Sequence, residues 1–392
     1  MNVAIFTDND FVKVNGVTTT LRAVVQHAPE DVRVRVYTAA ETGSDEADYF
    51  ALRSLGVPIP WYGEMRMYVP RLRAYLAEAV RDRIDVVHLT TPGPIGLAAL
   101  YVASRLNLPL VGSFHTDLAA YTTLLSGSTR LGALMREYMR WLYSRCARVL
   151  VPSEATREML VAARCRPEKL AVWPRGVDTG LFSPAKRSRR LRDSWHVSDR
   201  RPAILYVGRV SAEKGLRMLP SLQRALHAVG LQHRFIIVGQ GPMRGELERH
   251  LWDAVFTGAL PRAEVAEIFA SSDLFVFPSR TDTAGNVVLE AQASGLPVLV
   301  SGAGGPRENM EEGRTGYVCD DETAGEWAEK AVTLLRDEPL CRGMRERARD
   351  YALSRRWDCA LKPLYDTYRS VVTVPRTSDA GSLLTPAVPR VP

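Results

Sequence analysis

The sequence predicts an α/β protein of two domains, each a mostly parallel β-sheet covered by helices. Its 392 residues exceed what one ordinary hydrophobic core serves and suit two α/β units. Short apolar runs that end at polar, Gly or Pro residues alternate with longer helical patterns, which is typical of a parallel sheet with crossover helices. This alternation stops once and then resumes, which predicts a domain boundary between the two halves.

The first domain is predicted over residues 1–180, where five apolar runs read as strands. Helical periodicity lies between them, as in Arg71–Val80 and Leu131–Tyr143. A segment with Pro, Gly and a basic run then follows, from Trp173 to Arg190, and marks the boundary. The predicted strands are Val3–Phe6, Val32–Tyr37, Val86–Leu89, Leu110–Phe114 and Arg148–Pro152.

The second domain is predicted over residues 200–353, and a last helix over about 354–370. The tail, residues 373–392, is rich in Pro, Ser and Thr without periodicity and is predicted to be disordered. The predicted strands of the second domain are Ala203–Val207, Arg234–Val238, Ala254–Thr257, Leu274–Pro278, Pro297–Val300 and Gly316–Val318.

Composition excludes several classes of protein. Hydrophobic residues make up 46% and charged residues 24%, as in soluble globular chains. The most apolar stretch, Gly93–Leu106, is too short to span a bilayer. The first eight residues are typical of a buried strand and not of a signal peptide, so a cytoplasmic location is expected. The five cysteines form no CxxC pair, which argues against zinc and disulfide frameworks.

The formal net charge of +7 suits an anionic partner such as a nucleotide, a phospholipid surface or nucleic acid. Nucleic-acid binding needs a contiguous basic and aromatic face, whereas the charge here is dispersed, so no nucleic-acid partner is expected.

Ligands of open α/β sheets bind beyond the carboxyl ends of the strands, so the loops at those ends are the candidate sites. After the first strand, Gly16 opens a helix, where backbone amides can approach an anion; a plain cap glycine would explain it equally well. After the first strand of the second domain, Arg209 and Lys214 flank a turn at a helix start. Their guanidinium and ammonium groups can clamp a diphosphate there.

The next strand is followed by Gly239-Gln240-Gly241, an incomplete dinucleotide fingerprint with Arg244 at the third glycine position. We interpret it as a turn near a base or ribose, with Gly241 as a donor-binding position, and not as an NAD site. This departure from the fingerprint disfavours the alternative of a Rossmann oxidoreductase.

The most informative loop runs from Ser279 to Ala291. Gly285-Asn286 caps a helix whose first amides, at Asn286, Val287 and Val288, can bind phosphate oxygens. Asp282 precedes this helix end and Glu290 lies about one turn inside it, so the two carboxylates would flank the phosphates and accept hydrogen bonds from sugar hydroxyls. In the first half, His115 lies just past a strand; a lone His is more often structural than functional.

Together these segments resemble glycosyltransferase family 4, a retaining family with the GT-B fold of two Rossmann-like domains around a cleft. The resemblance extends from Met1 to about Tyr368, and the branch is similar to GDP-mannose-dependent α-mannosyltransferases and glycolipid-forming enzymes. Members usually have Glu where this chain has Asp282. The matching segments are Asn15-Gly16-Val17, Phe114-His115-Thr116-Asp117, Arg175-Gly176-Val177-Asp178, Gly208-Arg209, Lys214-Gly215 and Asp282 to Glu290.

The resemblance implies a role for each of these positions. Gly16 would lie under the donor phosphates, and Arg209 with Lys214 would neutralise the leaving diphosphate. His115 would face the transferred sugar, Asp282 would hold its hydroxyls and Glu290 would bind the ribose. It also implies that the last helix returns to the first domain.

The function expected from the sequence is transfer of a hexose from a nucleotide-diphosphate sugar to a lipid-linked or glycan hydroxyl. The resemblance favours GDP-mannose; a UDP-hexose donor, a sugar-nucleotide epimerase and a non-catalytic nucleotide-sugar binding protein are the alternatives. No metal or cofactor is expected, because two cations already offset the diphosphate.

An acceptor held in a membrane would suit the basic and aromatic segments Arg136–Arg145 and Trp61–Tyr68. A basic amphipathic helix that simply packs on the core explains the first segment as well. Peripheral contact with an anionic membrane is therefore an expectation that a liposome experiment must test.

Overall fold

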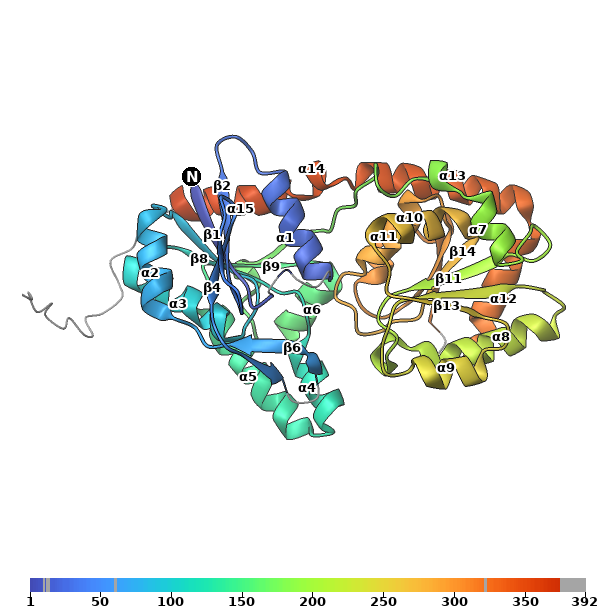
Figure 1. The fold of residues 1–392 in the computed structure, drawn as a ribbon, viewed down its shortest axis with the longest axis horizontal. Coiled ribbons are helices and arrows are strands. Elements are labelled where there is room, and N and C mark those ends of the chain that lie inside the picture. Colours follow the sequence, from blue (N-terminus) through green and yellow to red (C-terminus); the bar gives the residue numbers. More distant parts are fainter. Residues whose placement is uncertain (10, 12–14, 60–61, 321–322, 374–392) are drawn as a thin grey trace, which may run out of the picture.

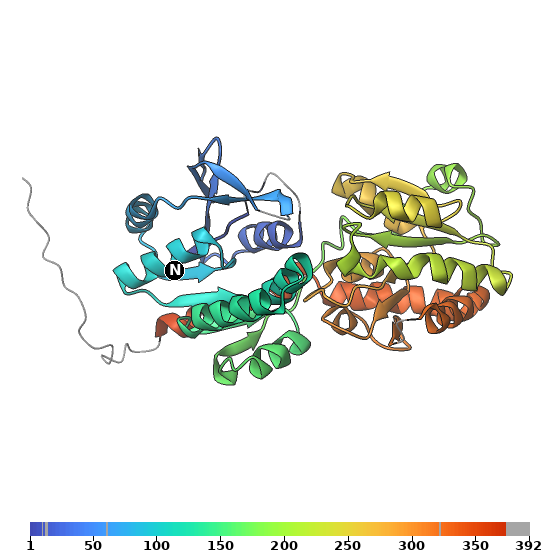
Figure 2. The same ribbon diagram turned by 90° about the horizontal axis from the view of Figure 1, so that it is seen from below.

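The computed structural model describes residues 1–9, 11, 15–59, 62–320 and 323–373. Its two α/β units lie side by side along the long axis of the molecule, and the chain passes between them twice (Figures 1 and 2). Each unit is a sheet with helices on both faces, so the prediction of a two-domain α/β protein is confirmed.

The first sheet has the strand order β10-β9-β8-β7-β1-β2-β4-β3, and only the β3–β4 pair is antiparallel. Its strands are β1 (Asn2–Phe6), β2 (Arg33–Ala40), β3 (Ser44–Asp45), β4 (Tyr49–Arg53), β7 (Val86–Leu89), β8 (Leu110–Ser113), β9 (Arg148–Val151) and β10 (Leu170–Val172). Its helices are α1 (Gly16–Gln26), α2 (Leu72–Arg81), α3 (Pro94–Leu106), α4 (Leu118–Ser126), α5 (Thr129–Ser144) and α6 (Glu154–Ala162).

The second sheet is parallel throughout, with the order β13-β12-β11-β14-β15-β16. Its strands are β11 (Ala203–Val207), β12 (Arg234–Val238), β13 (Val255–Gly258), β14 (Leu274–Phe277), β15 (Val298–Ser301) and β16 (Gly316–Cys319). Its helices are α7 (Arg189–Ser194), α8 (Leu219–Ala228), α9 (Arg244–His250), α10 (Arg262–Ser271), α11 (Asn286–Ala293), α12 (Ala324–Arg336) and α13 (Glu338–Ser354).

All eleven strands expected from the apolar runs are present, ten of them within one residue at each end, and β2 ends three residues beyond the predicted Val32–Tyr37. The predicted strands did not include β3, β4 and β10, or the antiparallel pair β5 (Gly56–Ile59) and β6 (Tyr62–Tyr68). Pro58 lies inside β5, and a proline within an apolar run argues against a strand unless the strand lies at a sheet edge.

The end of the chain packs against the first domain. Helices α14 (Trp357–Ala360) and α15 (Lys362–Thr373), with Leu361 between them, place five buried side chains in the core on one face of the first sheet. The Tyr365 hydroxyl donates to the Val24 carbonyl at 2.6 Å. The two linkers are also joined, because the Val177 amide donates to the Arg355 carbonyl at 3.0 Å. From residue 374 on, the predicted disordered tail lies outside the described residues.

Within the described ranges, none of the helices is long and apolar enough to cross a membrane. The five cysteines are free thiols, as expected from their scattered positions.

Candidate functional site

Two helix N-termini, one from each domain, face each other between the two sheets. Gly16 is the first residue of α1 and Asn286 is the first residue of α11. A Cβ added to Gly16 would lie 3.7 Å from the Asn286 side-chain nitrogen, so the two helix ends are in contact range. Because each N-terminus carries partial positive charge, an anion between them is stabilised by both helices.

The loop before α11 has a fixed shape. Gly285 has φ +70°, and a Cβ there would lie 2.9 Å from Pro306. The Val288 amide donates to the Gly285 carbonyl at 3.0 Å, so of the three amides predicted to bind phosphate, those of Asn286 and Val287 remain at the open helix end. Within the described residues, the buried Asn286 Oδ1 has no hydrogen-bond partner.

At the start of α1 a side chain already caps the helix. Asn15 Oδ1 accepts from the amides of Val17 and Thr18, each at 2.9 Å, and Thr18 Oγ1 accepts from the Asn15 amide. Gly16, which is exposed, is therefore the residue of this turn whose backbone an anion can approach without displacing the cap.

Lys214 and Asp282 form an ion pair in the cleft. The Lys214 ammonium donates to both carboxylate oxygens, at 2.7 and 2.9 Å, and both side chains are largely buried. Lys214 was predicted to bind the diphosphate and Asp282 the sugar, whereas in this structure the two side chains bind each other. A diphosphate that attracts Lys214 would release the Asp282 carboxylate toward a sugar hydroxyl.

The loop that carries Lys214 packs tightly under the end of β14. Gly215 has φ +71°, and a Cβ there would lie 2.4 Å from the Pro278 carbonyl oxygen. Thr281 Oγ1 donates to the Glu213 carbonyl at 3.0 Å, which ties the two predicted site loops together. Arg209, partly exposed, follows β11 on the same loop, and its carbonyl accepts from the Tyr206 hydroxyl at 2.8 Å.

The glycines after β12 have a structural explanation. A Cβ on Gly239 would lie 1.9 Å from the Gly208 carbonyl oxygen, and one on Gly241 would lie 2.2 Å from that of Val210. These glycines let the loops after β11 and β12 touch, without any ligand. Donor binding at Gly241 stays a prediction.

His115 lies on the first domain's side of the cleft, partly exposed, and is bound through both ring nitrogens. Nδ1 lies 3.1 Å from the Arg175 guanidinium, and Nε2 lies 2.8 Å from Ser113 Oγ. Burial, followed by the charge of Arg175, holds the pKa of His115 well below its ordinary value. The His115 carbonyl accepts from Thr283 Oγ1 of the second domain at 2.7 Å.

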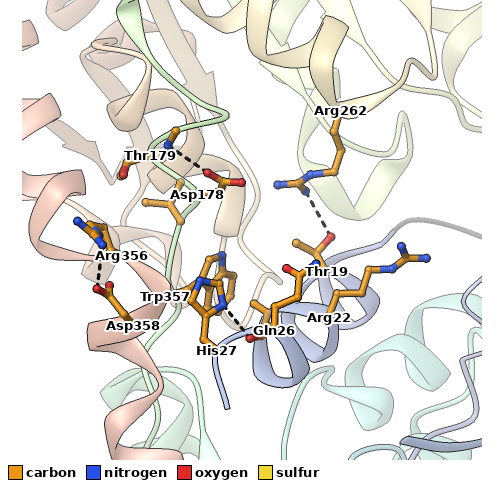
Figure 3. A pocket seen from close by; sticks show the side chains of 13 residues that line it. Thr19, Arg22, Gln26, His27, Asp178, Thr179, Arg262, Arg356, Trp357 and Asp358 are labelled. Carbon is orange, nitrogen blue, oxygen red and sulfur yellow. Dashed lines mark hydrogen bonds and ion pairs between the residues drawn. The ribbon is translucent and has the colours of Figure 1, made fainter. Parts of the chain in front are cut away.

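Glu290 also has a partner that the sequence reading did not identify. Its carboxylate forms an ion pair with Arg262 at 3.3 Å, and Arg262 also donates to Thr19 Oγ1 of α1 at 3.3 Å. Figure 3 shows Arg262 reaching across to α1. Burial raises the pKa of Glu290 to about 7, although Arg262 lowers it.

Arg262 forms part of the wall of a pocket of about 580 Å³ between α1, α10 and the two linkers (Figure 3). The other walls are mostly polar and include Arg22, Asp178 and Arg356. The pocket lies on the side of α1 that faces the two linkers. Arg262 therefore lies between this pocket and the carboxylate of Glu290, which is predicted to bind ribose.

A second group of contacts joins the domains near α6. The Glu308 carboxylate accepts from the amides of Glu154 and Ala155, both at 2.7 Å, and so caps a helix of the other domain. Ser153 Oγ donates to the Thr283 carbonyl at 3.1 Å. Thr283 therefore bonds the first domain through both its hydroxyl and its carbonyl.

Of the residues that the sequence reading missed, Arg262 could have been found. It opens a helix shortly after the predicted strand Ala254–Thr257, where the same strand-end rule applies. Thr283 lies within the predicted loop Ser279–Ala291, but its contacts and those of Glu308 gave no signal, since their partners lie in the other domain. In the part of the chain described, no three His, Cys, Asp or Glu side chains are grouped as metal ligands.

Comparison with known proteins identifies the family. The profile of Glycosyltransferase Family 4 matches residues 14–181, and that of Glycosyl transferases group 1 matches residues 201–337. A GDP-mannose-dependent alpha-mannosyltransferase of Mycolicibacterium smegmatis is 34% identical over 382 residues, which cover 95% of this chain and 98% of that protein. The sulfoquinovosyl transferase SQD2 of Arabidopsis thaliana is 32% identical over 300 residues, 74% of this chain and 58% of that longer protein.

The fold has solved counterparts. The structure of HepE from Anabaena in complex with UDP-glucose superposes with a TM-score of 0.73 over 94% of this chain and 100% of that one, at 20% identity. The fold has two Rossmann-like domains, and helix N-termini and basic side chains lie at the cleft between them. These features and the profile matches along both domains indicate the same family. The chain is a hexosyltransferase with the GT-B fold and belongs to glycosyltransferase family 4.

Proposed function

We propose that this enzyme is a retaining mannosyltransferase that takes mannose from GDP-mannose and transfers it to a hydroxyl of a lipid-linked or glycan acceptor. The observation that carries the proposal is the pair of helix N-termini at Gly16 and Asn286, with Lys214 paired to Asp282 in the loop before α11. These groups suit a diphosphate. The mycobacterial relative named for GDP-mannose supports the choice of donor, and the fold's UDP-glucose-bound counterpart makes a UDP-hexose the second candidate.

The diphosphate would bind the amides of Asn286 and Val287, with Arg209 and Lys214 offsetting its charge. As the bond between sugar carbon and phosphate oxygen breaks, the leaving phosphate oxygen accepts the proton of the acceptor hydroxyl on the same face of the sugar. The acceptor oxygen then bonds to that carbon with retention and without a covalent enzyme intermediate. The enzyme contributes positioning and charge stabilisation. An Arg209→Ala variant that kept full turnover would contradict this mechanism.

The first test is thermal unfolding with GDP, UDP, their hexose conjugates and NAD. A ligand at a hundred times its Kd stabilises by about 2.7 kcal/mol, enough to raise Tm by several degrees. A shift with GDP and not UDP supports the mannosyltransferase, and the reverse supports a UDP-hexose enzyme. A shift with NAD alone would overturn the proposal.

Turnover separates the remaining alternatives. Conversion of the donor's sugar without an acceptor would indicate an epimerase, and binding without turnover would indicate a nucleotide-sugar binding protein. We propose that transfer needs no resident metal, since two cations of the chain offset the diphosphate. Loss of transfer on dialysis against EDTA, with recovery on adding Mg²⁺ or Mn²⁺, would refute this.

We also propose that α4 and α5 of the first domain rest on an anionic membrane that supplies the acceptor. Leu134 and Trp141 of α5 are 67% and 43% exposed, and Leu124 and Leu125 of α4, which packs against α5, are exposed as well. Arg145 lies over the Trp141 ring at 5.4 Å. Apolar side chains flanked by arginines suit the interface of an anionic bilayer.

A basic pocket of about 370 Å³ lies at the end of this surface and supports a phosphate-bearing lipid. It is lined by Arg140, Trp141, Arg164, Arg166 and Lys169, among others, and none of its described lining residues is Asp or Glu. The other segment considered for membrane contact, Trp61–Tyr68, has Trp61 outside the described residues.

Flotation with vesicles of phosphatidylcholine alone and with added phosphatidylglycerol tests the membrane proposal. Binding to the anionic vesicles only, weakened by salt and by Leu134→Asp, supports it. No binding at any ionic strength would leave α5 as an amphipathic helix with exposed arginines.

A further inference from the structure

The two ring nitrogens of His115 contact groups of different hydrogen-bonding character. Arg175 is 3.1 Å from Nδ1, and a guanidinium can only donate, so Nδ1 must accept. In a neutral ring the single proton is then on Nε2, which donates to Ser113 Oγ at 2.8 Å. The contacts thus select one tautomer.

Arg175 is rigidly held for this contact. It is only 3% exposed, donates to the Trp173 carbonyl at 3.2 Å, and lies over the Trp173 ring at 4.6 Å. Trp173 is itself fully buried. Within the described residues, no hydrogen bond or ion pair of Arg175 goes to a carboxylate.

A buried cation without a counter-ion costs stability. Burial lowers the pKa of Arg175 to about 9, and because this value lies above 7, the side chain is still charged at neutral pH. The guanidinium therefore keeps its donating role at His115 over the physiological range.

Among the described residues, the groups whose charge acts on the pKa of His115 are Arg175 and His88, and neither is negative. The groups that face the His115 ring are Arg175 itself, the imidazole of His88 on β7, and the Trp173 ring. Burial lowers the pKa of His88 to about 3, and its Nδ1 pairs with the Tyr368 hydroxyl of α15 at 2.6 Å. The contact from the second domain, Thr283 Oγ1, goes to the His115 carbonyl and not to the ring. Protonation of the ring would place two cations side by side.

We propose that Arg175 is a positioning residue that holds His115 as the neutral Nε2–H tautomer, so that His115 serves the transferred sugar as a hydrogen-bond donor and not as a base. The proposal rests on the proposed function in one respect, that the sugar lies at His115. Ser113 Oγ is then the resting acceptor, and a sugar oxygen takes its place when the donor binds. The proton stays on Nε2 throughout, and the leaving phosphate is the base.

The direct test is ¹⁵N–¹H correlation of the full chain labelled at its seven histidines, with His115 assigned from a His115→Gln spectrum. We expect Nε2 protonated and Nδ1 unprotonated, with no titration from pH 5.5 to 8. A proton on Nδ1, or a titration within that range, would overturn the proposal. This measurement needs no substrate, so it stands even if the proposed donor is wrong.

Activity tests the consequence. In Arg175→Met the donor to Nδ1 and the nearby charge are removed, so His115 should populate both tautomers and titrate at weakly acidic pH. We expect kcat at pH 7 to fall about tenfold, a drop in kcat below about pH 6.5 that wild type lacks, and recovery of the wild-type pH profile in Arg175→Lys.

Arg349→Met is the matched control, because Arg349 also donates from a partly buried position to backbone carbonyls, those of Thr179, Phe182 and Ala293. It should lower Tm without creating an acidic limb. An Arg175→Met enzyme with the wild-type pH profile and the wild-type His115 spectrum would overturn the proposal.

Discussion

The raised pKa of Glu290 predicts that donor affinity falls as the pH drops from 8 to 6. Burial raises the pKa of this carboxylate to about 7, and Arg262 is the group among the described residues that opposes the shift. Ribose hydroxyls donate hydrogen bonds, so they need the ionised carboxylate. Binding of the nucleotide sugar must therefore be accompanied by loss of a proton whenever Glu290 starts protonated.

The magnitude follows from the pKa. With a value near 7, about nine tenths of Glu290 is ionised at pH 8 and about one tenth at pH 6. If only the ionised form binds ribose, Kd rises about tenfold over this range, equivalent to about 1.4 kcal/mol. The assay is calorimetric titration of GDP-mannose, whose esterified diphosphate has no group that titrates between these values, in buffers of different ionisation enthalpy that count the released protons.

Two variants make the test specific. Glu290→Gln should bind more weakly at pH 8 and show no such pH dependence. Arg262→Ala should move the loss of affinity to higher pH, because the cation that lowers the pKa of Glu290 is removed. An affinity in wild type that stays constant between pH 8 and 6, or a Glu290→Gln variant with the wild-type pH profile, would refute the reasoning.

Three further predictions concern the loops around the cleft. Lys214→Met should lower kcat/KM by about 10²–10³-fold, whereas Asp282→Asn should keep GDP affinity and lose turnover. Equal loss of GDP affinity in both variants would contradict the assignment of Lys214 to the diphosphate and Asp282 to the sugar. Gly285→Ala should destabilise by about 1–2 kcal/mol, more than the control Gly313→Ala, because both have φ +70° but only Gly285 faces Pro306; equal Tm values would count against the steric argument. Glu308→Gln should cost about 1 kcal/mol and lower Tm by roughly 2–4 °C, since α6 loses the charge that caps it from the other domain; an unchanged Tm would show that the cap adds nothing.

The sequence alone determined the two sheets and the edge at which ligands bind. Strands such as Ala203–Val207 are short apolar runs bounded by polar or Gly residues, and this local signal needs no tertiary information. The loops after those strands carried Gly16, Lys214, Asp282 and Asn286, because parallel strands bring their carboxyl ends to one edge.

Only the tertiary structure decided which side chains of the cleft form hydrogen bonds and ion pairs with one another. Lys214 is 68 residues from Asp282, Arg262 reaches Thr19 at a separation of 243, and His115 meets Arg175 across 60. A hydrogen bond depends on distances of about 3 Å, which the spacing of residues along a strand or helix does not specify once the chain has folded back. The sequence therefore indicates which side chains reach the cleft, and the packing of two domains decides which of them are neutralised, desolvated or held in one tautomer.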